Sequence, residues 1–367
     1  LLRILNHSMS RHLIPIFLIL TCLCTGLNAQ PVRPDFTTVD QRARSIRYED
    51  DIVKLTQSLT SPYSDKLSKV RSIFIWITDH IRYDWKFFNK DEEIEIPECK
   101  SGQDCDEVLA NWEKKYLATI LRKGKAISDG YARLFTRMCD IAGLEAATIN
   151  GHTKTKLYQI GNAGPVNHSW NVIWLDTTWH LLDATWSAGY TTEDENTGKL
   201  NGFVKQYNDY YFLTPFAEFS RNHFPQYTRW VLKPGYTKDK FAANPYFDPD
   251  ILSKIKLHSP LTGMINGKKG DTIHFKFEYT GNIEKLQVNT NLYRNAEVWG
   301  WEQINKRKKI WVQDTFALKR QRYTPFVKTG DLYQFDYVIP ENSLYYLDIL
   351  FDFQRVMRFK VVIVKPK

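Results

Sequence analysis

Cysteine is scarce in this chain, with 5 residues among 367, and only Cys99, Cys105 and Cys139 follow residue 29. Cys99 and Cys105 flank a short polar loop, a spacing that suits a local disulfide in an oxidising compartment. A zinc site would need further ligands near them, and His152, His180 and His223 show no ligand spacing, so we expect no metal and no cofactor. Cys139 lies on the apolar side of a predicted helix, where a buried free thiol is expected.

The chain also lacks a hydrophobic run long enough to span a bilayer comfortably. Its apolar stretch Leu13–Leu23 follows Arg11 and a possible start at Met9, and leads through small and polar residues to Ala29. This pattern is typical of a secretory signal with cleavage near Ala29. We therefore expect residues 1–29 to be a signal peptide, and the mature protein to be exported, periplasmic or extracellular, without an integral membrane segment.

Acidic residues are fewer than basic ones, which gives a formal net charge of +9, and loss of Arg3 and Arg11 with residues 1–29 would leave +7. Such a charge could favour anionic partners, including cell-wall polymers or nucleic acid. The basic clusters 306–309 and 319–322 lie between strand-like runs, however, and are expected to be solvated hairpin ends. Since export also argues against nucleic acid, we expect none to bind.

Apolar residues recur at helical spacing in the first part of the chain. This pattern predicts a helix over Ser45–Leu59, a second that starts at Ser64 or Asp65 and runs to Ile81, and a third over Val108–Arg122. A fourth helix follows Ser128 and stops at Gly143. An acidic insertion, 91–107, separates the second helix from the third.

The period then changes to two, which predicts strands. Expected here are the strands Ala146–Gly151, Ser169–Leu175 and Trp179–Ala184, a turn at 176–178, a loop between Trp186 and Tyr207, and a strand at Tyr210–Leu213. Helices followed by an antiparallel sheet make an α+β fold. Residues 233–249 are rich in Pro, Gly and Lys and are expected to form a linker. Further alternating runs suggest a C-terminal β-sandwich, namely Thr272–Tyr279, Leu286–Tyr293, Lys309–Val312, Leu332–Val338 and Tyr345–Phe353.

Three polar residues in this first part carry the candidate chemistry. Ser128 stands at a predicted helix start, where the helix dipole stabilises negative charge, while His168 and Asp183 lie on successive strands. A nucleophile, a histidine that moves its proton and a carboxylate that fixes the imidazole tautomer form a catalytic triad. The order along the chain therefore predicts that Ser128, His168 and Asp183 meet in one site.

The motifs around these residues resemble the transglutaminase-like superfamily, which has the papain-type fold, and its kyphoscoliosis-peptidase-like subgroup in particular. The matching segments are Ile75–Asp84, Gly130–Ala132, Ala142–Leu144, His168–Asn171, Asp183–Trp186, Tyr211–Leu213 and His223–Pro225. The resemblance implies a transglutaminase-like domain over 30–232, with an N-terminal helical extension, and an immunoglobulin-like β-sandwich over 250–367. It implies a cysteine where this chain has Ser128. The family includes peptidases, cross-linking enzymes and members without catalytic residues.

This serine leaves several interpretations open. Serine is a favoured N-cap, so Ser128 could serve the helix alone. We expect foremost an exported protein whose cleft binds a peptide or cell-wall peptide, with weak or no catalysis. The alternatives are a peptidase, amide hydrolase or acyl transferase that uses Ser128, and a scaffold that binds partners without catalysis. The serine itself could be a natural or an engineered exchange. Trp170, Trp186 and Tyr83 are candidate cleft-lining residues, although core packing or a helix-end turn would also explain them.

Overall fold

The computed structural model describes residues 34–364 except 93, 195 and 307. All secondary-structure elements given below lie within one compact unit, Phe36–Lys367. The predicted signal peptide 1–29 lies outside the described residues. None of the helices in the described ranges combines the length and the apolar character that a bilayer crossing requires.

Helices dominate the first part of this unit: α1 (Thr37–Ser45), α2 (Ile52–Thr60), α3 (Lys66–His80), α4 (Trp85–Phe88), α5 (Cys105–Lys123) and α6 (Ser128–Ile141). Asp65 caps α3 by accepting a hydrogen bond from the backbone N–H of Ser68, which confirms that predicted helix start. The helix predicted over Ser45–Leu59 is confirmed only in its second part, as α2, and its predicted start at Ser45 is wrong. The chain turns between α1 and α2, where Asp50 has a φ of 53° and Asp51 caps the new helix.

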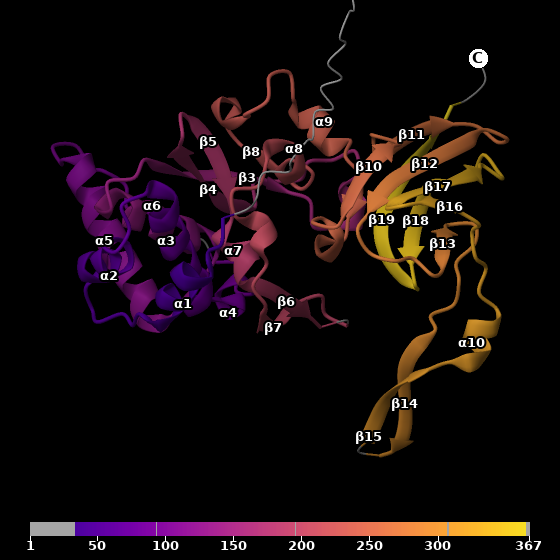
Figure 1. The fold of residues 1–367 in the computed structure, drawn as a ribbon, viewed down its shortest axis with the longest axis horizontal. Helices are drawn as coiled ribbons and strands as arrows, with labels where there is room; N and C mark the ends of the chain where they lie inside the picture. Colours follow the sequence, from indigo (N-terminus) through magenta and orange to yellow (C-terminus); the bar gives the residue numbers. More distant parts are fainter. Residues whose placement is uncertain (1–33, 93, 195, 307, 365–367) are drawn as a thin grey trace, which may run out of the picture. The chain divides into compact units, whose positions relative to one another are not determined.

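A four-stranded antiparallel sheet follows, in the order β5-β4-β3-β8. Its strands are β3 (Ala146–Thr153), β4 (His168–Leu175), β5 (Thr178–Leu182) and β8 (His223–Pro225). Asp176 and Thr177 both have positive φ, as a tight turn between β4 and β5 requires, which confirms the predicted hairpin. Helix α6 packs on this sheet, and α3 packs in turn on α6 (Figure 1). Both helices share a buried apolar cluster with Ile173 of β4.

The segment between β5 and β8 differs from the sequence prediction. It contains α7 (Ala184–Ala188), the hairpin β6 (Gly189–Glu193) and β7 (Leu200–Lys205), the 3₁₀ turn η2 (Asp209–Tyr211) and α8 (Phe216–Phe219). The stretch expected to be a loop thus forms a hairpin. The predicted strand Tyr210–Leu213 is wrong, because Asn208 caps η2 through its side chain and starts a turn instead. A short parallel pair, β1 (Arg82–Tyr83) and β2 (Lys125–Ala126), lies just before α6.

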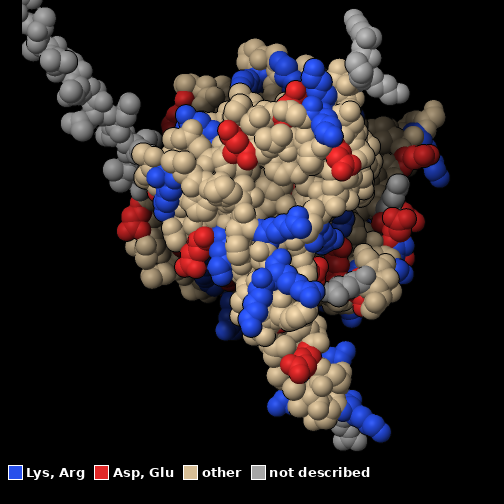
Figure 2. Space-filling view, turned by 90° about the vertical axis from the view of Figure 1, so that its right-hand side faces the viewer, with Lys and Arg blue, Asp and Glu red and all other residues tan. Residues whose placement is uncertain are grey.

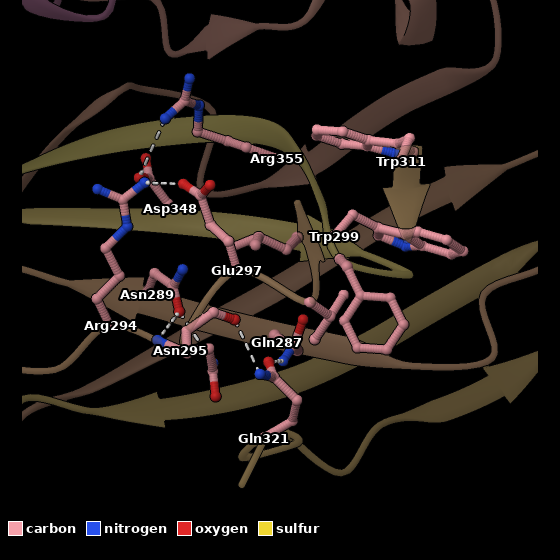
Figure 3. Close-up of a pocket in the computed structure, with 14 residues that line it drawn as sticks. Gln287, Asn289, Arg294, Asn295, Glu297, Trp299, Trp311, Gln321, Asp348 and Arg355 are labelled. Carbon is pink, nitrogen blue, oxygen red and sulfur yellow. Dashed lines mark hydrogen bonds and ion pairs between the residues drawn. The ribbon is translucent and has the colours of Figure 1, made fainter. Parts of the chain in front are cut away.

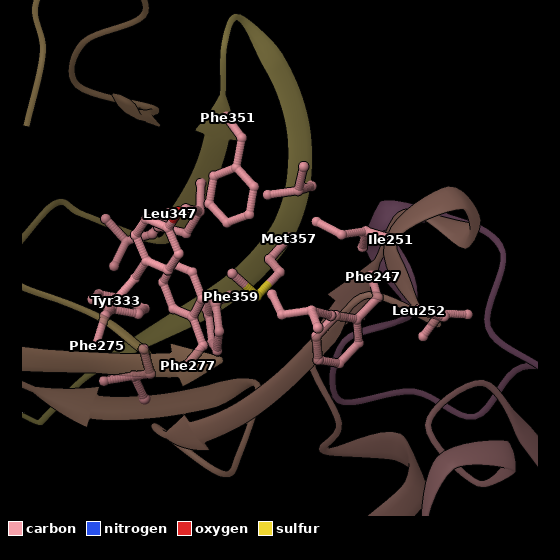
Figure 4. Packing of buried hydrophobic residues seen from close by; sticks show 14 of the residues in the cluster. Phe247, Ile251, Leu252, Phe275, Phe277, Tyr333, Leu347, Phe351, Met357 and Phe359 are labelled. Atoms are coloured by element: carbon pink, nitrogen blue, oxygen red, sulfur yellow. The ribbon is translucent and has the colours of Figure 1, made fainter. Parts of the chain in front are cut away.

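The C-terminal part is built from two sheets, as predicted. One has the order β10-β12-β17-β16, and the other β11-β19-β18-β13 with β9 paired to β19. The strands are β9 (Tyr246–Phe247), β10 (Ile255–Ser259), β11 (Met264–Gly267), β12 (Thr272–Tyr279), β13 (Leu286–Thr290), β16 (Val327–Thr329), β17 (Leu332–Val338), β18 (Tyr346–Phe351) and β19 (Gln354–Ile363). Figure 4 shows aromatic side chains of both sheets packed between them; the rings of Phe275 and Phe359 lie 5.3 Å apart.

Residues 233–249, which the composition predicts to be a linker, carry structure of their own. They contain α9 (Lys238–Ala242) and β9, and the short turns η3 (Thr228–Trp230) and η4 (Pro249–Ile251) flank them. Phe247 of β9 and Met357 of the sandwich lie in one buried cluster (Figure 4). Trp170 of the α+β sheet belongs to the same cluster. The apolar core is therefore continuous from the first part to the second.

An additional two-stranded ribbon, β14 (Trp299–Asn305) and β15 (Lys308–Gln313), extends from the sandwich and is followed by α10 (Thr315–Lys319) (Figure 1). Of the basic cluster at 306–309, Lys306 lies at the turn of the ribbon and Lys308 and Lys309 begin β15, as expected. The cluster at 319–322 instead begins at the last residue of a helix, α10. Acidic and basic side chains are interspersed over most of the face in Figure 2, with several Lys and Arg gathered above the narrow projection at its lower end.

Candidate functional site

The side chain of Asp183 is held in place by the helix that follows it. Asp183 follows β5 and serves as the N-cap of α7, where its Oδ1 accepts hydrogen bonds from the backbone N–H groups of Thr185 at 2.8 Å and Trp186 at 3.1 Å. The residue is fully buried. A capping carboxylate is held by the helix it caps, so the orientation of Asp183 is set by the backbone of α7.

The second carboxylate oxygen of Asp183 meets two imidazoles. Nε2 of His168 lies 2.7 Å from Oδ2, and Nε2 of His223 lies 3.2 Å from the same atom. Burial acts to raise the carboxyl pKa, but the hydrogen bonds and charges of His168 and His223 outweigh it and hold that pKa below its usual range. Asp183 is therefore ionised at neutral pH, although it is sealed from solvent.

His168 is oriented as a general base requires. Because Nε2 donates to the ionised Asp183, the neutral ring carries its lone pair on Nδ1. Nδ1 makes no hydrogen bond to any described residue. Since it is also not a buried atom without a partner, it must be in contact with solvent. The ring packs beside Trp186, with 5.3 Å between ring centres, which holds it in place.

Ser128 is the first residue of α6, and Ile127 occupies the N-cap position without a side-chain capping bond. Ser128 therefore does not act as the N-cap of α6, since its hydroxyl makes no capping hydrogen bond. Its hydroxyl also has no hydrogen-bond partner among the described residues and no bond to His168, yet it is not sealed off, and 8% of the residue is exposed. The hydroxyl is free to meet a ligand at the positive end of a fourteen-residue helix.

The register of α6 on the sheet places Ser128 near the end of β4 that carries His168. Asn171 of β4 donates from Nδ2 to the carbonyl oxygen of Ala132 at 2.9 Å and to Oγ1 of Thr136 at 3.0 Å. Ala132 lies one helical turn after Ser128, and His168 lies three residues before Asn171 on the strand. Further along, the C-terminal half of α6 shares its apolar cluster with Ile173. The start of α6 and the start of β4 are therefore on the same side of the domain.

The three residues proposed to line the cleft occupy different surroundings. Tyr83 pairs through its backbone with Ala126, two residues before Ser128, and burial together with the charge of Asp183 raises its pKa. Trp186 is partly buried and packs on His223, with ring centres 4.5 Å apart. Trp170 is 1% exposed and lies in the core behind His168, so it supports the imidazole from within rather than facing solvent.

His223 is a member of this cluster that the sequence analysis did not assign to it. It is fully buried, and its ring lies 4.2 Å from that of Phe219, so burial lowers its pKa from 6.5 to about 4 despite Asp183. Its Nδ1 lies 2.7 Å from Oδ1 of Asn222. The segment His223–Pro225 matches a family motif, but 40 residues separate it from Asp183, and only the pairing of β8 with β3 brings them together.

His168, Asp183 and His223 form a group whose potential ligand atoms lie within 4.8 Å of one another. Two ligands of a tetrahedral ion with bonds of about 2.05 Å would be about 3.3 Å apart. The 2.7 Å between His168 and Asp183 is shorter and is the length of a charge-assisted hydrogen bond. The geometry fits a shared proton between these residues and does not fit an ion bridging them.

The cysteines lie outside this cluster. Cys99 and Cys105 are free thiols, so the predicted disulfide is not formed, but their side chains are close enough to hydrogen-bond to each other. Cys139 of α6 is fully buried, and burial raises the pKa of its thiol. It lies eleven residues beyond Ser128 on the same helix, about 16 Å away, and cannot take its place.

The sequence is similar to several known proteins. Residues 53–184 match the model of the transglutaminase-like superfamily. Kyphoscoliosis peptidase of Mus musculus is 35% identical over 246 residues, which cover 65% of this chain and 33% of that protein. The Homo sapiens protein is 34% identical over 249 residues, with the same two shares. Hillarin of Drosophila melanogaster is 26% identical over 223 residues, 58% of this chain and 25% of that protein. The chain spans about a third of the length of the kyphoscoliosis peptidases it matches.

Proposed function

We propose, starting from the transglutaminase-like domain that this chain carries, that the protein is exported and binds an extended peptide at the start of α6, with weak or no amide turnover. One observation carries the proposal. The His168–Asp183 pair has its hydrogen bond, while Ser128 is the residue at the helix start where the family resemblance predicts a cysteine. The supporting machinery of an acyl-transfer site thus accompanies a weaker nucleophile.

The chemical difference between serine and cysteine explains the expected weakness. A helix start can stabilise a thiolate, but a hydroxyl is far less acidic and remains protonated at neutral pH. Ser128 would need His168 to remove its proton during the attack, and no hydrogen bond joins the two side chains among the described residues. A site shaped for sulfur also misplaces oxygen by roughly an ångström, which can cost about 100-fold in rate.

The proposed ligand follows from the same residues. Ser128 and Nδ1 of His168 offer one donor and one acceptor that have no partner in the described part of the protein, and an amide group can satisfy both. A peptide or the peptide of a cell wall presents such groups in series. Partly buried aromatic side chains such as Trp186 and Tyr83 supply apolar contact beside them.

The test compares the natural chain with Ser128→Ala and Ser128→Cys. Cleavage of fluorescein-labelled casein should be close to background for the natural chain and for Ser128→Ala, and should rise about 100-fold or more for Ser128→Cys. The double variant Ser128→Cys with His168→Ala is the control and should lose this gain, because the thiol then has no base. If Ser128→Ala abolishes a measurable activity of the natural chain, the protein is a serine-dependent hydrolase instead.

Binding is tested separately, by fluorescence anisotropy of a labelled peptic digest of casein. Trp186→Ala should weaken binding, whereas Tyr345→Ala, which removes an exposed aromatic side chain of the β-sandwich, should not. Absence of saturable binding by the natural chain, together with no turnover in any variant, would favour a scaffold without a functional cleft.

A further inference from the structure

The ribbon β14–β15 displays tryptophan on one face only. Trp301 is directly opposite Trp311, and Trp299 precedes Trp301 by two residues, so all three indoles project from the same side. They are 44%, 66% and 54% exposed for Trp299, Trp301 and Trp311, respectively. Large aromatic side chains gathered on an exposed surface mark an interaction site more often than single ones do.

Trp299 and Trp311 border a cavity of about 290 Å³ on the outer face of the sandwich (Figure 3). Along β13, Leu286 and Val288 point into the core, while the alternate residues Gln287 and Asn289 line the cavity. These two amides are almost fully buried, at 0% and 6% exposed. The floor of the cavity is therefore polar, and one wall of it is aromatic.

Gln287 carries an unused hydrogen-bond acceptor. Its Nε2 donates to Oε1 of Gln321 at 2.8 Å, but its own Oε1 has no partner among the described residues. A buried carbonyl oxygen without a hydrogen bond destabilises the structure that contains it. A ligand that donates a hydrogen bond into the cavity would satisfy it. The neighbouring Asn289 is engaged, because its Oδ1 accepts from the backbone and the side chain of Asn295, both at 2.9 Å.

The charged side chains that line the cavity are paired. Arg294 lies 3.6 Å from Glu297, and Arg355 lies 3.7 Å from Asp348 (Figure 3). Asp348 is also the bidentate partner of Arg358, with 2.5 Å from Nε to Oδ1 and 2.7 Å from Nη2 to Oδ2. Each of the four charged side chains that line the cavity therefore already has a partner of opposite charge. Fixed charges that are already paired can still form hydrogen bonds with neutral hydroxyl groups.

We propose that the cavity and the three indoles bind a neutral oligosaccharide, at a site separate from Ser128. A sugar ring has an apolar face of C–H groups that packs on an indole, and a rim of hydroxyls that donate to and accept from amides and carboxylates. The cavity is at the small end of ligand pockets, so it accommodates one ring, and further rings lie along the ribbon. A proline-rich peptide would contact mainly the indoles, and a polyanion would contact mainly the arginines.

The experiment is isothermal titration of the full chain with chitohexaose, cellohexaose and mannohexaose, with hexaproline and a heparin hexasaccharide as competing classes. We expect saturable binding of at least one neutral hexasaccharide. Trp299→Ala and Trp311→Ala should each weaken it 10-fold or more, and both replace side chains that are half exposed, so folding should persist. Phe316→Ala, an exposed aromatic residue of α10 outside the cavity lining, is the matched control and should bind normally.

The remaining outcomes overturn the proposal. Failure of all three neutral hexasaccharides to bind, or binding that the two tryptophan variants leave unchanged, would exclude a saccharide site here. Binding of hexaproline alone would identify a peptide site, and binding of the heparin hexasaccharide alone would identify a polyanion site. Ser128→Ala should leave saccharide binding unchanged, so a failure here is distinguishable from a failure of the proposed peptide cleft.

Discussion

The buried His223 predicts that this protein loses stability in mild acid. Burial lowers the pKa of His223 from 6.5 to about 4 in the folded state, even though Asp183 attracts its proton. The unfolded chain therefore takes up this proton at a higher pH than the folded chain does. The stability that a neutral His223 contributes is present above pH 6.5 and is lost as the pH falls toward 4.

The size of this loss follows from the two pKa values. Linkage gives about 2.5 kcal/mol between pH 7.5 and pH 4.5 for a histidine titrating at about 4 when folded and 6.5 when unfolded. Asp183 contributes little in this range, since its folded pKa is lowered and its contribution is lost only near and below the ordinary aspartate pKa of about 3.9. His168 is bound to the same carboxylate, so a variant is needed that changes the contribution of His223 alone.

His223→Phe provides that isolation. The new ring keeps the stacking on Phe219, 4.2 Å away, and the contact with Trp186, but it removes the bond to Asp183. At pH 7.5 the loss of a hydrogen bond to a charged group should cost about 1.5–3 kcal/mol. At pH 4.5 the natural chain loses its His223 contribution, and the two proteins should converge.

The assay is urea unfolding followed by circular dichroism at both pH values, with the free energy of unfolding taken from midpoint and slope. His274→Gln, which changes an exposed histidine, is the control and should follow the natural chain. If the natural chain and His223→Phe lose the same free energy between pH 7.5 and 4.5, His223 is not held neutral by burial and the reasoning is refuted.

Arg71→Met should destabilise the fold by about 3–5 kcal/mol in urea unfolding, because the buried guanidinium is the bidentate partner of Asp40. Arg44→Met, which removes a more exposed partner of Asp40, should cost 1 kcal/mol or less, and equal costs would contradict this difference. Thiol titration of the reduced native protein without residues 1–29, which contain Cys22 and Cys24, should find Cys99 and Cys105 reactive and Cys139 only after unfolding. Mild oxidation should remove the first two through a mutual disulfide, and a peptide map without that bridge would contradict it.

The parts of the fold with a clear period could be predicted from the sequence. Apolar spacing predicted α3, with a start at Ser64 or Asp65, of which Asp65 is the cap. Alternation predicted β12 and β17 with their observed bounds. The strand predicted over Trp179–Ala184 ends early, at Leu182, because Asp183 leaves the ladder to cap α7. A short polar side chain can bond to nearby backbone N–H groups and so end a strand. The pattern of apolar residues does not show where this happens.

Long-range contacts set the limit of what the sequence could reveal about the site. His168 and Asp183 are 15 residues apart on neighbouring strands, so their meeting could be expected. His223 joins them only because β8 pairs with the far edge of β3, across a segment whose 3₁₀ turn and hairpin the pattern misjudged. No local feature of a lone histidine separates a buried partner of a carboxylate from an ordinary core residue.

The hydrogen bonds of Asp183 also limit what its presence says about catalysis. Its two oxygens accept from two backbone N–H groups and face two imidazoles, which uses about four acceptor positions, all of those a carboxylate offers. Removing this side chain would uncap α7 and leave buried donors unpaired, so it stabilises the fold whether or not the site is active. The same holds for His168, whose Nε2 is part of that network. Ser128, in contrast, makes no bond that the fold requires. The chemistry of the site is therefore decided at Ser128, and exchange there by cysteine tests function with little effect on stability.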